Sequence, residues 1–331
     1  MTTTPAISLI MAVYNGEEHL AEAMDSILAQ SFTNFECIVV DDASSDSTPV
    51  ILAQYAEADN RVKVLRNDAN RERSFSRNRA IQAARAQLIA VADADDWLHP
   101  DRLQKQYDFM QQNHHIGVCG SWISVYETGQ LWQWPVSDAA IRAHMLFNSP
   151  IAHPTVIFRK TVFQQLAYGY DERCILAEDY DLWERLSRLD VVFANIPDVL
   201  LRYRLYPQKD RSAYRDVLVR CADAVRLRQI QLLGLEPDTY ERTIHSMLSG
   251  AQEPNFPSDV RAVRLWKNKL LTANMKKKIY GHAALNEQLQ TLDQGLVRRL
   301  LWHRGRGCWR KYSPDWLQRS YRWVKTLIRG S

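Results

Sequence analysis

The 331-residue sequence contains no Cys-x-x-Cys pair and no long apolar segment. Its five cysteines are scattered and odd in number, which argues against a disulfide framework and against a zinc site. No run approaches the roughly 18 apolar residues that a membrane span needs. Because the first residues also lack the basic region and cleavage site of a secretory signal, we expect a cytoplasmic protein.

The sequence also lacks internal repeats and low-complexity segments. Hydrophobic residues make up 46% of it and charged residues 24%, which is ordinary for a globular protein with a full core. The net charge is only +4, but residues 296–331 contain ten Lys and Arg and a single acid, Asp315. The chain therefore combines a mildly acidic body with a basic tail.

Short apolar runs alternate with helical segments over the first part of the chain. The runs cover residues 6–13, 35–40, 61–65 and 88–92. The segments between them have the apolar spacing of helices, so the pattern predicts an α/β fold with parallel strands and helices on both faces.

From about residue 116 the alternation becomes irregular. Further strands are predicted in a mixed sheet, with one helix at 178–189; the strands are expected at residues 117–126, 154–159, 191–196 and 199–206. From about residue 209 to the end the pattern is helical.

Polar clusters follow three of the four early strands. They are Tyr14 with Asn15, Asp41 with Asp42, and the Asp-Ala-Asp-Asp run at 93–96. In open parallel sheets, ligands bind outside the carboxyl ends of the strands, so these clusters are expected to line one crevice. Carboxylates that repel one another at one rim favour an oxygen-bound cation, Mg²⁺ or Mn²⁺ rather than zinc.

A run of arginines after the third early strand adds positive charge to the same crevice. These are Arg71, Arg73, Arg77 and Arg79. Together with the carboxylates they indicate a metal-bridged phosphate ligand. Taken singly, each piece has an ordinary explanation: the aspartates could cap helices or form turns, and the arginines could form a solvated face.

Six motifs together resemble the inverting nucleotide-sugar glycosyltransferases of family 2, which have the GT-A fold. The motifs are VYNGEEHLAEAMDSILAQSF, IVVDDASSDST, SFSRNRAI, ADADDWLHPDRL, HPTVIFRK and AEDYDLWERL. The resemblance extends over about residues 6–208. It implies a GT-A domain at 1–208, with a nucleotide-sugar-binding half at 1–115 and an acceptor half at 116–208, followed by a helical region at 209–331.

The resemblance implies a role for each residue of the donor site. Tyr14 would lie against the base of the nucleotide, and Asp42 would accept a hydrogen bond from the ring N–H. Arg77 would reach the base or the diphosphate. Asp93 would contact the ribose, and Asp95 would bind the divalent metal, Mn²⁺ or Mg²⁺, that bridges both phosphates.

The same resemblance implies the acceptor site. Asp179 would be the catalytic base and Glu178 would position the acceptor, while Asp181 should face elsewhere on the helix. The sequence departs from the family at Tyr206, where many members have a histidine near the leaving diphosphate. Arg204 would then compensate by contacting the phosphates.

These roles imply transfer of a sugar from a nucleotide-diphospho-sugar, most simply a UDP-sugar. The acceptor would be a glycan or a lipid-linked hydroxyl in bacterial surface-polysaccharide synthesis. With Asp179 as the one base and no second carboxylate placed as a nucleophile, the residues favour a single displacement with inversion.

Three other classes of protein share parts of this pattern. A phosphohydrolase with an Asp-x-Asp nucleophile would carry that motif after its first strand, where this chain has YNGEE. A nucleic-acid binder is disfavoured by the acidic body. A non-catalytic nucleotide-sugar-binding scaffold stays open, because the departure at Tyr206 is compatible with lost activity.

The tail at residues 313–331 has the pattern of an amphipathic basic helix. Its apolar face includes Leu317, Val324 and Leu327, and its arginines and Lys325 lie opposite. Such a helix suits peripheral contact with an anionic membrane, which for this chain would be the inner face of the cell membrane. The alternative is that the apolar face packs on the protein body or on a second subunit.

Overall fold

The structure is a computed structural model that describes residues 4–167, 169–205, 212–251 and 258–304. Contacts divide the chain into two units. The first consists of Met1–Pro237 with Leu270–Gln288, and the second of Asp238–Lys269 with Leu289–Ser331. The predicted domain boundary at residue 208 lies outside the described residues and stays a prediction.

The four predicted early strands are present in the first unit. They are β1 (Ile7–Val13), β2 (Phe35–Asp41), β3 (Val62–Arg66) and β4 (Leu88–Val91). The helices between them are α1 (Leu20–Leu28), α2 (Thr48–Ala58) and α3 (Glu72–Ala83). β1 pairs in parallel with both β2 and β4, and β2 pairs in parallel with β3, so the predicted βαβαβαβ order is confirmed.

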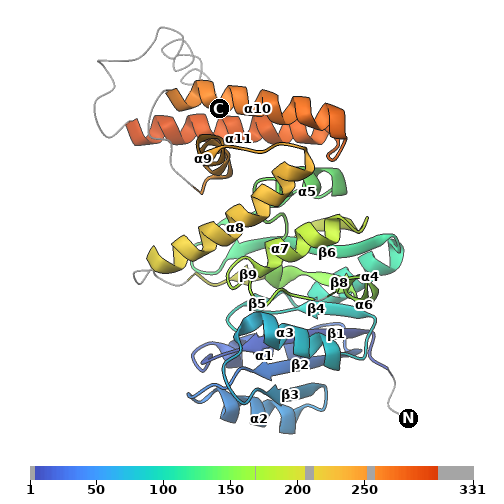
Figure 1. Cartoon of the computed structure of the whole chain (residues 1–331). Coiled ribbons are helices and arrows are strands. Elements are labelled where there is room, and N and C mark those ends of the chain that lie inside the picture. The colour runs from blue at the N-terminus through green and yellow to red at the C-terminus, as the bar shows by residue number, and fades with distance from the viewer. Residues whose placement is uncertain (1–3, 168, 206–211, 252–257, 305–331) are drawn as a thin grey trace, which may run out of the picture. The chain divides into compact units, whose positions relative to one another are not determined.

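The later part of the sheet is mixed. Its strands are β5 (Trp97–Leu98), β6 (Ile116–Val125), β7 (Leu131–Trp132), β8 (Ile157–Arg159) and β9 (Val192–Tyr203). β8 pairs antiparallel with β4 and β6, and β6 pairs in parallel with β9. Across the described residues the sheet has the order β3-β2-β1-β4-β8-β6-β9-β5, with β7 beside β6 (Figure 1). The strands predicted at 191–196 and 199–206 are not separate: the structure has one strand there, β9, which covers Val192–Tyr203.

Helices cover both faces of this sheet because its strands alternate apolar side chains to both sides. Leu9, Met11 and Val13 of β1 belong to a core that includes residues of α1 and of α4 (Arg102–Gln112). Ile10, the intervening residue, belongs to a second core with residues of α3 and of α7 (Glu178–Ser187). The sheet is therefore held from both sides, and its strand ends are fixed in place.

Three short helices and one longer helix also belong to the first unit. They are α5 (Asp138–Met145), η1 (His153–Thr155), α6 (Lys160–Gln164) and α8 (Ser212–Leu232). Two acids of α7, Asp181 and Glu184, form ion pairs with Arg228 of α8. These pairs fix α7, whose first turn carries the predicted catalytic carboxylates.

The second unit consists of helical segments. α9 (Thr239–Ser249) begins with a capping box in which the Asp238 and Glu241 side chains bond each other's backbone N–H groups. The remaining helices are α10 (Ser258–Lys277) and α11 (His282–Arg304), of which residues 258–269 and 289–304 belong to this unit and the rest to the first. Within the described ranges, no helix combines the length and the apolar character needed to cross a membrane.

Candidate active site

The predicted polar clusters meet at the carboxyl ends of the parallel strands. Val13 of β1 is in register with Asp41 of β2, and the N–H of Asp42 donates to the carbonyl of Val13 at 2.8 Å. The N–H of Ala92 donates to the carbonyl of Ile10 at 3.0 Å. The residues that follow β1, β2 and β4 therefore lie side by side, as the strand order predicts.

Side-chain hydrogen bonds join the turn after β1 to the turn after β2. Asn15 accepts from the N–H of Ser45 at 2.9 Å, and the N–H of Gly16 donates to the Thr48 hydroxyl at 2.8 Å. A Cβ on Gly16 would meet a methyl of Val13 at 2.6 Å, so any other residue would force the Val13 side chain or the turn to shift. Asn15 has a φ of 51° and Glu72 a φ of 67°, a strained region that is favoured at functional sites.

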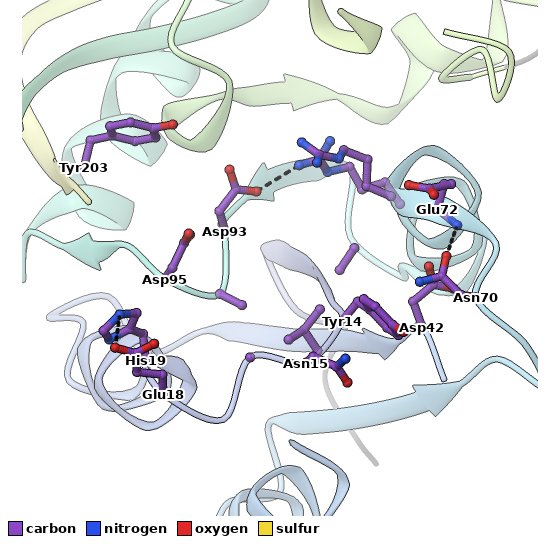
Figure 2. Close-up of a pocket in the computed structure, with 16 residues that line it drawn as sticks. Tyr14, Asn15, Glu18, His19, Asp42, Asn70, Glu72, Asp93, Asp95 and Tyr203 are labelled. Carbon is purple, nitrogen blue, oxygen red and sulfur yellow. Dashed lines mark hydrogen bonds and ion pairs between the residues drawn. The ribbon is translucent and has the colours of Figure 1, made fainter. Parts of the chain in front are cut away.

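A cavity of about 590 Å³ lies over these turns. Among the predicted site residues it is lined by Tyr14, Asp42, Arg77, Asp93 and Asp95. In Figure 2, Asp93 and Asp95 project from one loop, with Tyr14 and Asp42 at another side of the same cavity. The volume is within the range of pockets that hold a small ligand.

Tyr14 and Asp42 provide an aromatic face and a fixed carboxylate. The Tyr14 side chain is 51% exposed, which is unusual for an aromatic residue beside a buried strand. Asp42 is buried, and its Oδ1 accepts from Asn67 at 2.6 Å and from the N–H of Arg71 at 2.9 Å. This pair suits the base of a nucleotide, which needs a stacking surface and an acceptor.

Arg77 connects the two halves of the site. Its Nη2 donates to Asp93 at 2.9 Å and its Nη1 to Glu178 at 2.7 Å. The Arg77 side chain is almost wholly buried, and its guanidinium lies over the Tyr170 ring at 5.7 Å. The predicted contact of Arg77 with the base or diphosphate stays a prediction, since both of these nitrogens bind carboxylates.

The loop after β4 carries three aspartates in different surroundings. Burial raises the pKa of Asp93, but the guanidinium groups of Arg77 and Arg73 outweigh it and hold that pKa below its usual value. Asp95 lines the cavity. Asp96 is buried, and burial together with the charges of Asp93 and Asp95 raises its pKa well above the usual value.

Glu178 and Asp179 stand at the start of α7 but outside the cavity lining. Asp179 accepts a hydrogen bond from the Ser149 hydroxyl at 2.8 Å. Burial and the neighbouring Glu178 carboxylate raise the pKa of Asp179 to about 6, although the Ser149 bond acts in the opposite direction. A carboxylate with a pKa near 6 is suited to accept a proton at neutral pH.

Asp181 faces away from this site, as the helical spacing predicts. It accepts from Arg185 at 2.8 Å and from Arg228 at 2.5 Å. The acids of α7 therefore have two different sets of partners. Glu178 binds Arg77 and Asp179 accepts from Ser149, while Asp181 and Glu184 bind basic residues that hold the helix.

Arg204 lies outside the cavity lining. Its Nη2 donates to Glu22 of α1 at 2.6 Å and its Nε to the main-chain carbonyl of Asp95 at 3.0 Å. The predicted contact of Arg204 with phosphate stays a prediction. Tyr206 lies outside the described residues.

The residues of the cavity fit a divalent metal that arrives with its ligand. Among the described residues, no three His, Cys, Asp or Glu side chains gather as a preformed metal site. Mg²⁺ is typically held by one or two carboxylates together with phosphate oxygens and water. Asp93 and Asp95 on the cavity wall match that limited protein contribution.

Several residues of the site were not predicted from the sequence. Glu18, His19 and Asn70 line the cavity, and Ser149 holds Asp179. Arg73, one of the four arginines predicted to add positive charge to this crevice, does line the cavity, four residues before Arg77, and is 3.9 Å from Glu178. Helical spacing could have selected Arg73 and Arg77 from the four arginines, because residues four apart share a face. Ser149 had no comparable signal.

Comparison with known proteins agrees with this arrangement. The model of Glycosyl transferase family 2 matches residues 8–166. An O-antigen biosynthesis glycosyltransferase, WbnJ of Escherichia coli, is 33% identical over 222 residues, 63% of this chain and 84% of the relative. An uncharacterized glycosyltransferase of Haemophilus influenzae is 31% identical over 226 residues, 65% of this chain and 70% of the relative.

Solved structures share the fold at lower identity. Staphylococcus aureus TarS 1-349 in complex with UDP has a TM-score of 0.54 and 18% identity, covering 87% of this chain and 91% of that one. The mannosyltransferase PcManGT of Pyrobaculum calidifontis, in complex with GDP-Man and Mn²⁺, has a TM-score of 0.58 and 16% identity, covering 92% and 89%. The chain has the GT-A fold that the sequence predicted, and it belongs to glycosyltransferase family 2.

Proposed function

We propose that this glycosyltransferase moves a sugar from a nucleotide-diphospho-sugar, a UDP-sugar, to a hydroxyl of a glycan or lipid-linked acceptor. The observation that carries the proposal is the Arg77 bridge. One guanidinium binds Asp93 on the cavity wall at 2.9 Å and Glu178 beside the candidate base at 2.7 Å. Donor-side and acceptor-side carboxylates are therefore adjacent, as a direct transfer requires.

The donor would bind in the cavity at the strand ends. Tyr14 offers an exposed ring for the base, and Asp42 offers a fixed acceptor for a ring N–H. Asp93 would accept from the ribose hydroxyls, because Arg77 keeps its carboxylate ionised. The complex of TarS with UDP supports a uridine nucleotide, and the PcManGT complex with GDP-Man is a reason to test others.

Asp179 would remove the proton from the acceptor hydroxyl as that oxygen attacks the anomeric carbon. Ser149 fixes one carboxylate oxygen, and Glu178 beside it would bind the acceptor. One base and no carboxylate nucleophile correspond to one displacement, in which the bond to the diphosphate breaks as the new bond forms. The configuration at the anomeric carbon would then invert.

Asp95 would bind Mn²⁺ or Mg²⁺, with Asp93 beside it on the same loop. The bound ion would stabilise the negative charge that develops on the leaving diphosphate. The Mn²⁺ in the PcManGT complex supports this choice of ion. Arg73, which lines the same cavity, adds positive charge near the phosphates.

A panel of nucleotide sugars with Mn²⁺ in a thermal-shift assay tests the donor. A ligand that binds only the native state stabilises it by RT ln(1 + [L]/Kd), about 2.7 kcal/mol at a hundredfold excess over Kd. We expect UDP-sugars to raise the Tm most, with the matched free sugars as the control. Stabilisation without transfer to any glycan acceptor would favour the non-catalytic scaffold, and no stabilisation by any donor would contradict the proposal.

Replacing Ser149 by alanine should shift the pH dependence of catalysis. The Ser149 hydroxyl donates to Asp179 and favours its charged form, so its loss should raise the pKa of Asp179 above about 6. The acid limb of kcat/KM should therefore move to higher pH, with activity lost first below neutrality and largely regained at alkaline pH. Initial rates measured from pH 5 to 9 check this.

The control for Ser149→Ala is Ser149→Thr, which keeps the hydroxyl. It should keep the acid limb of the wild type. An unchanged pH profile in the alanine variant would contradict the assignment of Asp179 as the base that Ser149 orients.

The biological setting that we propose is surface-polysaccharide synthesis at the inner face of the cell membrane. The O-antigen biosynthesis relative supports the pathway class. Contact with anionic lipid would come from the basic tail at residues 313–331, which lies outside the described residues. A lipid-linked acceptor would be reached from there.

A further inference from the structure

Arg204 directly follows β9 and makes three hydrogen bonds to two other segments. Its Nη2 donates to Glu22 Oε2 at 2.6 Å, and its Nε donates to the carbonyl of Asp95 at 3.0 Å. Its main-chain N–H donates to Asp96 Oδ1 at 3.0 Å. The Arg204 side chain is only 13% exposed. One residue thus binds the loop that carries the candidate metal ligand at two successive positions.

Tyr126, directly after β6, closes this group of contacts. The Arg204 guanidinium lies 4.3 Å from the centre of the Tyr126 ring, and the Tyr126 hydroxyl donates to Glu22 Oε1 at 2.7 Å. Each oxygen of Glu22 therefore has its own partner. The N–H of Tyr126 also donates to the carbonyl of Tyr203 at 2.8 Å, which joins β6 to the end of β9.

Arg204, Glu22 and Tyr126 form a closed ring of interactions, and Arg204 attaches the loop with Asp95 to this ring. A charged bond between Arg204 and Glu22 is stronger than a neutral one, and the stacked Tyr126 ring restricts the guanidinium further. If the Arg204 guanidinium moved away, the Glu22 carboxylate would lose its charged partner. The guanidinium therefore has little freedom to move. The loop with Asp95 is therefore held by a preorganised support.

We propose that Arg204, with Glu22 and Tyr126, is a positioning residue for Asp95 rather than a ligand of the diphosphate. This inference rests on the proposed role of Asp95 as the metal ligand. By holding the Asp95 carbonyl and the Asp96 carboxyl, Arg204 fixes the chain directly after the Cα of Asp95. In Figure 2, the Asp95 side chain projects from this loop toward the cavity.

The two possible roles of Arg204 predict opposite effects for Glu22→Gln. If Glu22 holds Arg204 in place for Asp95, the neutral side chain loosens the support and weakens metal binding. If Arg204 instead moves to the diphosphate, removing the charge of Glu22 frees it and tightens nucleotide binding. Supporting groups of metal ligands commonly contribute 10- to 100-fold in metal affinity.

The experiment measures Mn²⁺ binding to the full chain by electron paramagnetic resonance of free Mn²⁺, with and without UDP. We expect Glu22→Gln and Arg204→Lys each to weaken Mn²⁺ binding in the presence of UDP by about tenfold. The double variant should be little worse than either, because both changes break one network. Tyr126→Phe, which removes only the hydroxyl, should show a smaller loss and guards against misfolding of the charged variants.

Turnover provides a second readout that a general loss of stability would not give. The Mn²⁺ concentration for half-maximal rate should rise about tenfold in Glu22→Gln, while kcat at saturating Mn²⁺ stays within about twofold. Asp25→Asn is the matched control, since Asp25 lies on the same helix and accepts from a tyrosine, Tyr55, at 2.6 Å. It should leave Mn²⁺ binding unchanged.

Three results would overturn the inference. Unchanged Mn²⁺ affinity in Glu22→Gln would exclude the positioning role and leave the proposed function intact. Tighter UDP binding in that variant would assign Arg204 to the diphosphate. If the wild-type protein binds UDP but no Mn²⁺, the proposed metal role of Asp95 is wrong, and so is the positioning role of Arg204. Metal binding in the wild type therefore separates failure of this inference from failure of the proposed function.

Discussion

Replacing Asp179 by asparagine is expected to lower kcat by roughly 10²- to 10⁴-fold while the nucleotide sugar still binds. The amide has nearly the shape of the carboxylate and can still accept the hydrogen bond from Ser149. It cannot take the proton of the acceptor hydroxyl. The donor cavity does not include Asp179 in its lining, so donor affinity should be preserved.

The measurement is a pair of assays on one variant. Thermal shift with the preferred nucleotide sugar and Mn²⁺ reports donor binding, and product formation under donor saturation reports kcat. Equal stabilisation with a large loss of rate assigns Asp179 to the transfer step rather than to binding.

Asp181→Asn is the matched control on the same helix. Asp181 binds Arg185 and Arg228, so its replacement should lower the Tm and leave kcat per folded molecule close to that of the wild type. If Glu178→Gln is inactive and Asp179→Asn is active, the roles of the two neighbouring carboxylates are exchanged.

The pH dependence of the wild type adds an independent check. Burial and Glu178 raise the pKa of Asp179 to about 6, so the base is charged above that pH and protonated below it. Transfer should therefore fall as the pH drops through about 6. A fall in the transfer rate at about pH 4 instead would indicate a carboxylate with an ordinary pKa, which would contradict the surroundings described for Asp179.

The order of the early strands and the position of the cavity could be predicted from the sequence because both depend on local signals. Apolar runs separated by helical segments require parallel pairing, and polar residues directly after such strands must meet at one edge. Tyr14, Asp42, Asp93 and Asp95 therefore lie together, at the end predicted for them. No contact between distant segments is needed to reach that result.

The partners of these residues could not be predicted, because they come from distant segments. Arg77 and Glu178 are separated by 101 positions, and Arg204 and Glu22 by 182. Their meeting depends on β8 inserting between β4 and β6 and on β9 pairing with β6, which apolar periodicity does not specify. The sequence thus predicted a role for Arg204 and gave no information about which groups it binds.

Glu178 and Asp179 illustrate the same division. Their place in the first turn of a helix was predicted and is confirmed, since α7 begins at Glu178. Their different surroundings were not predictable from adjacent positions in the sequence. Glu178 binds Arg77 and Asp179 accepts from Ser149, because consecutive residues of a helix point about 100° apart.

Replacing Asp95 by asparagine is expected to lower kcat by at least about 10²-fold, and EDTA should abolish transfer by the wild type. The neutral amide is a weaker ligand for a hard cation than a carboxylate, so charge on the leaving diphosphate would lack its main stabiliser. Mn²⁺ or Mg²⁺ added back should restore the wild type and only partly restore the variant. Rates measured against metal concentration in both proteins check this.

Asp101→Asn is the control for this change, because Asp101 lies six residues further along the chain and is exposed, with Ser31 as its hydrogen-bond partner. It should retain the rate and the metal dependence of the wild type.

Full transfer in EDTA by the wild type would exclude a metal at Asp95, and the leaving diphosphate would then have to be stabilised by cationic side chains alone. Of the arginines that line the cavity, Arg77 binds Asp93 and Glu178 at 2.9 and 2.7 Å, whereas Arg73 is 3.9 Å from Glu178, so Arg73 would have to contribute most of that positive charge. An Arg73→Gln variant would in that case lose more activity than Asp95→Asn, whereas with a metal at Asp95 the order of the two effects is reversed.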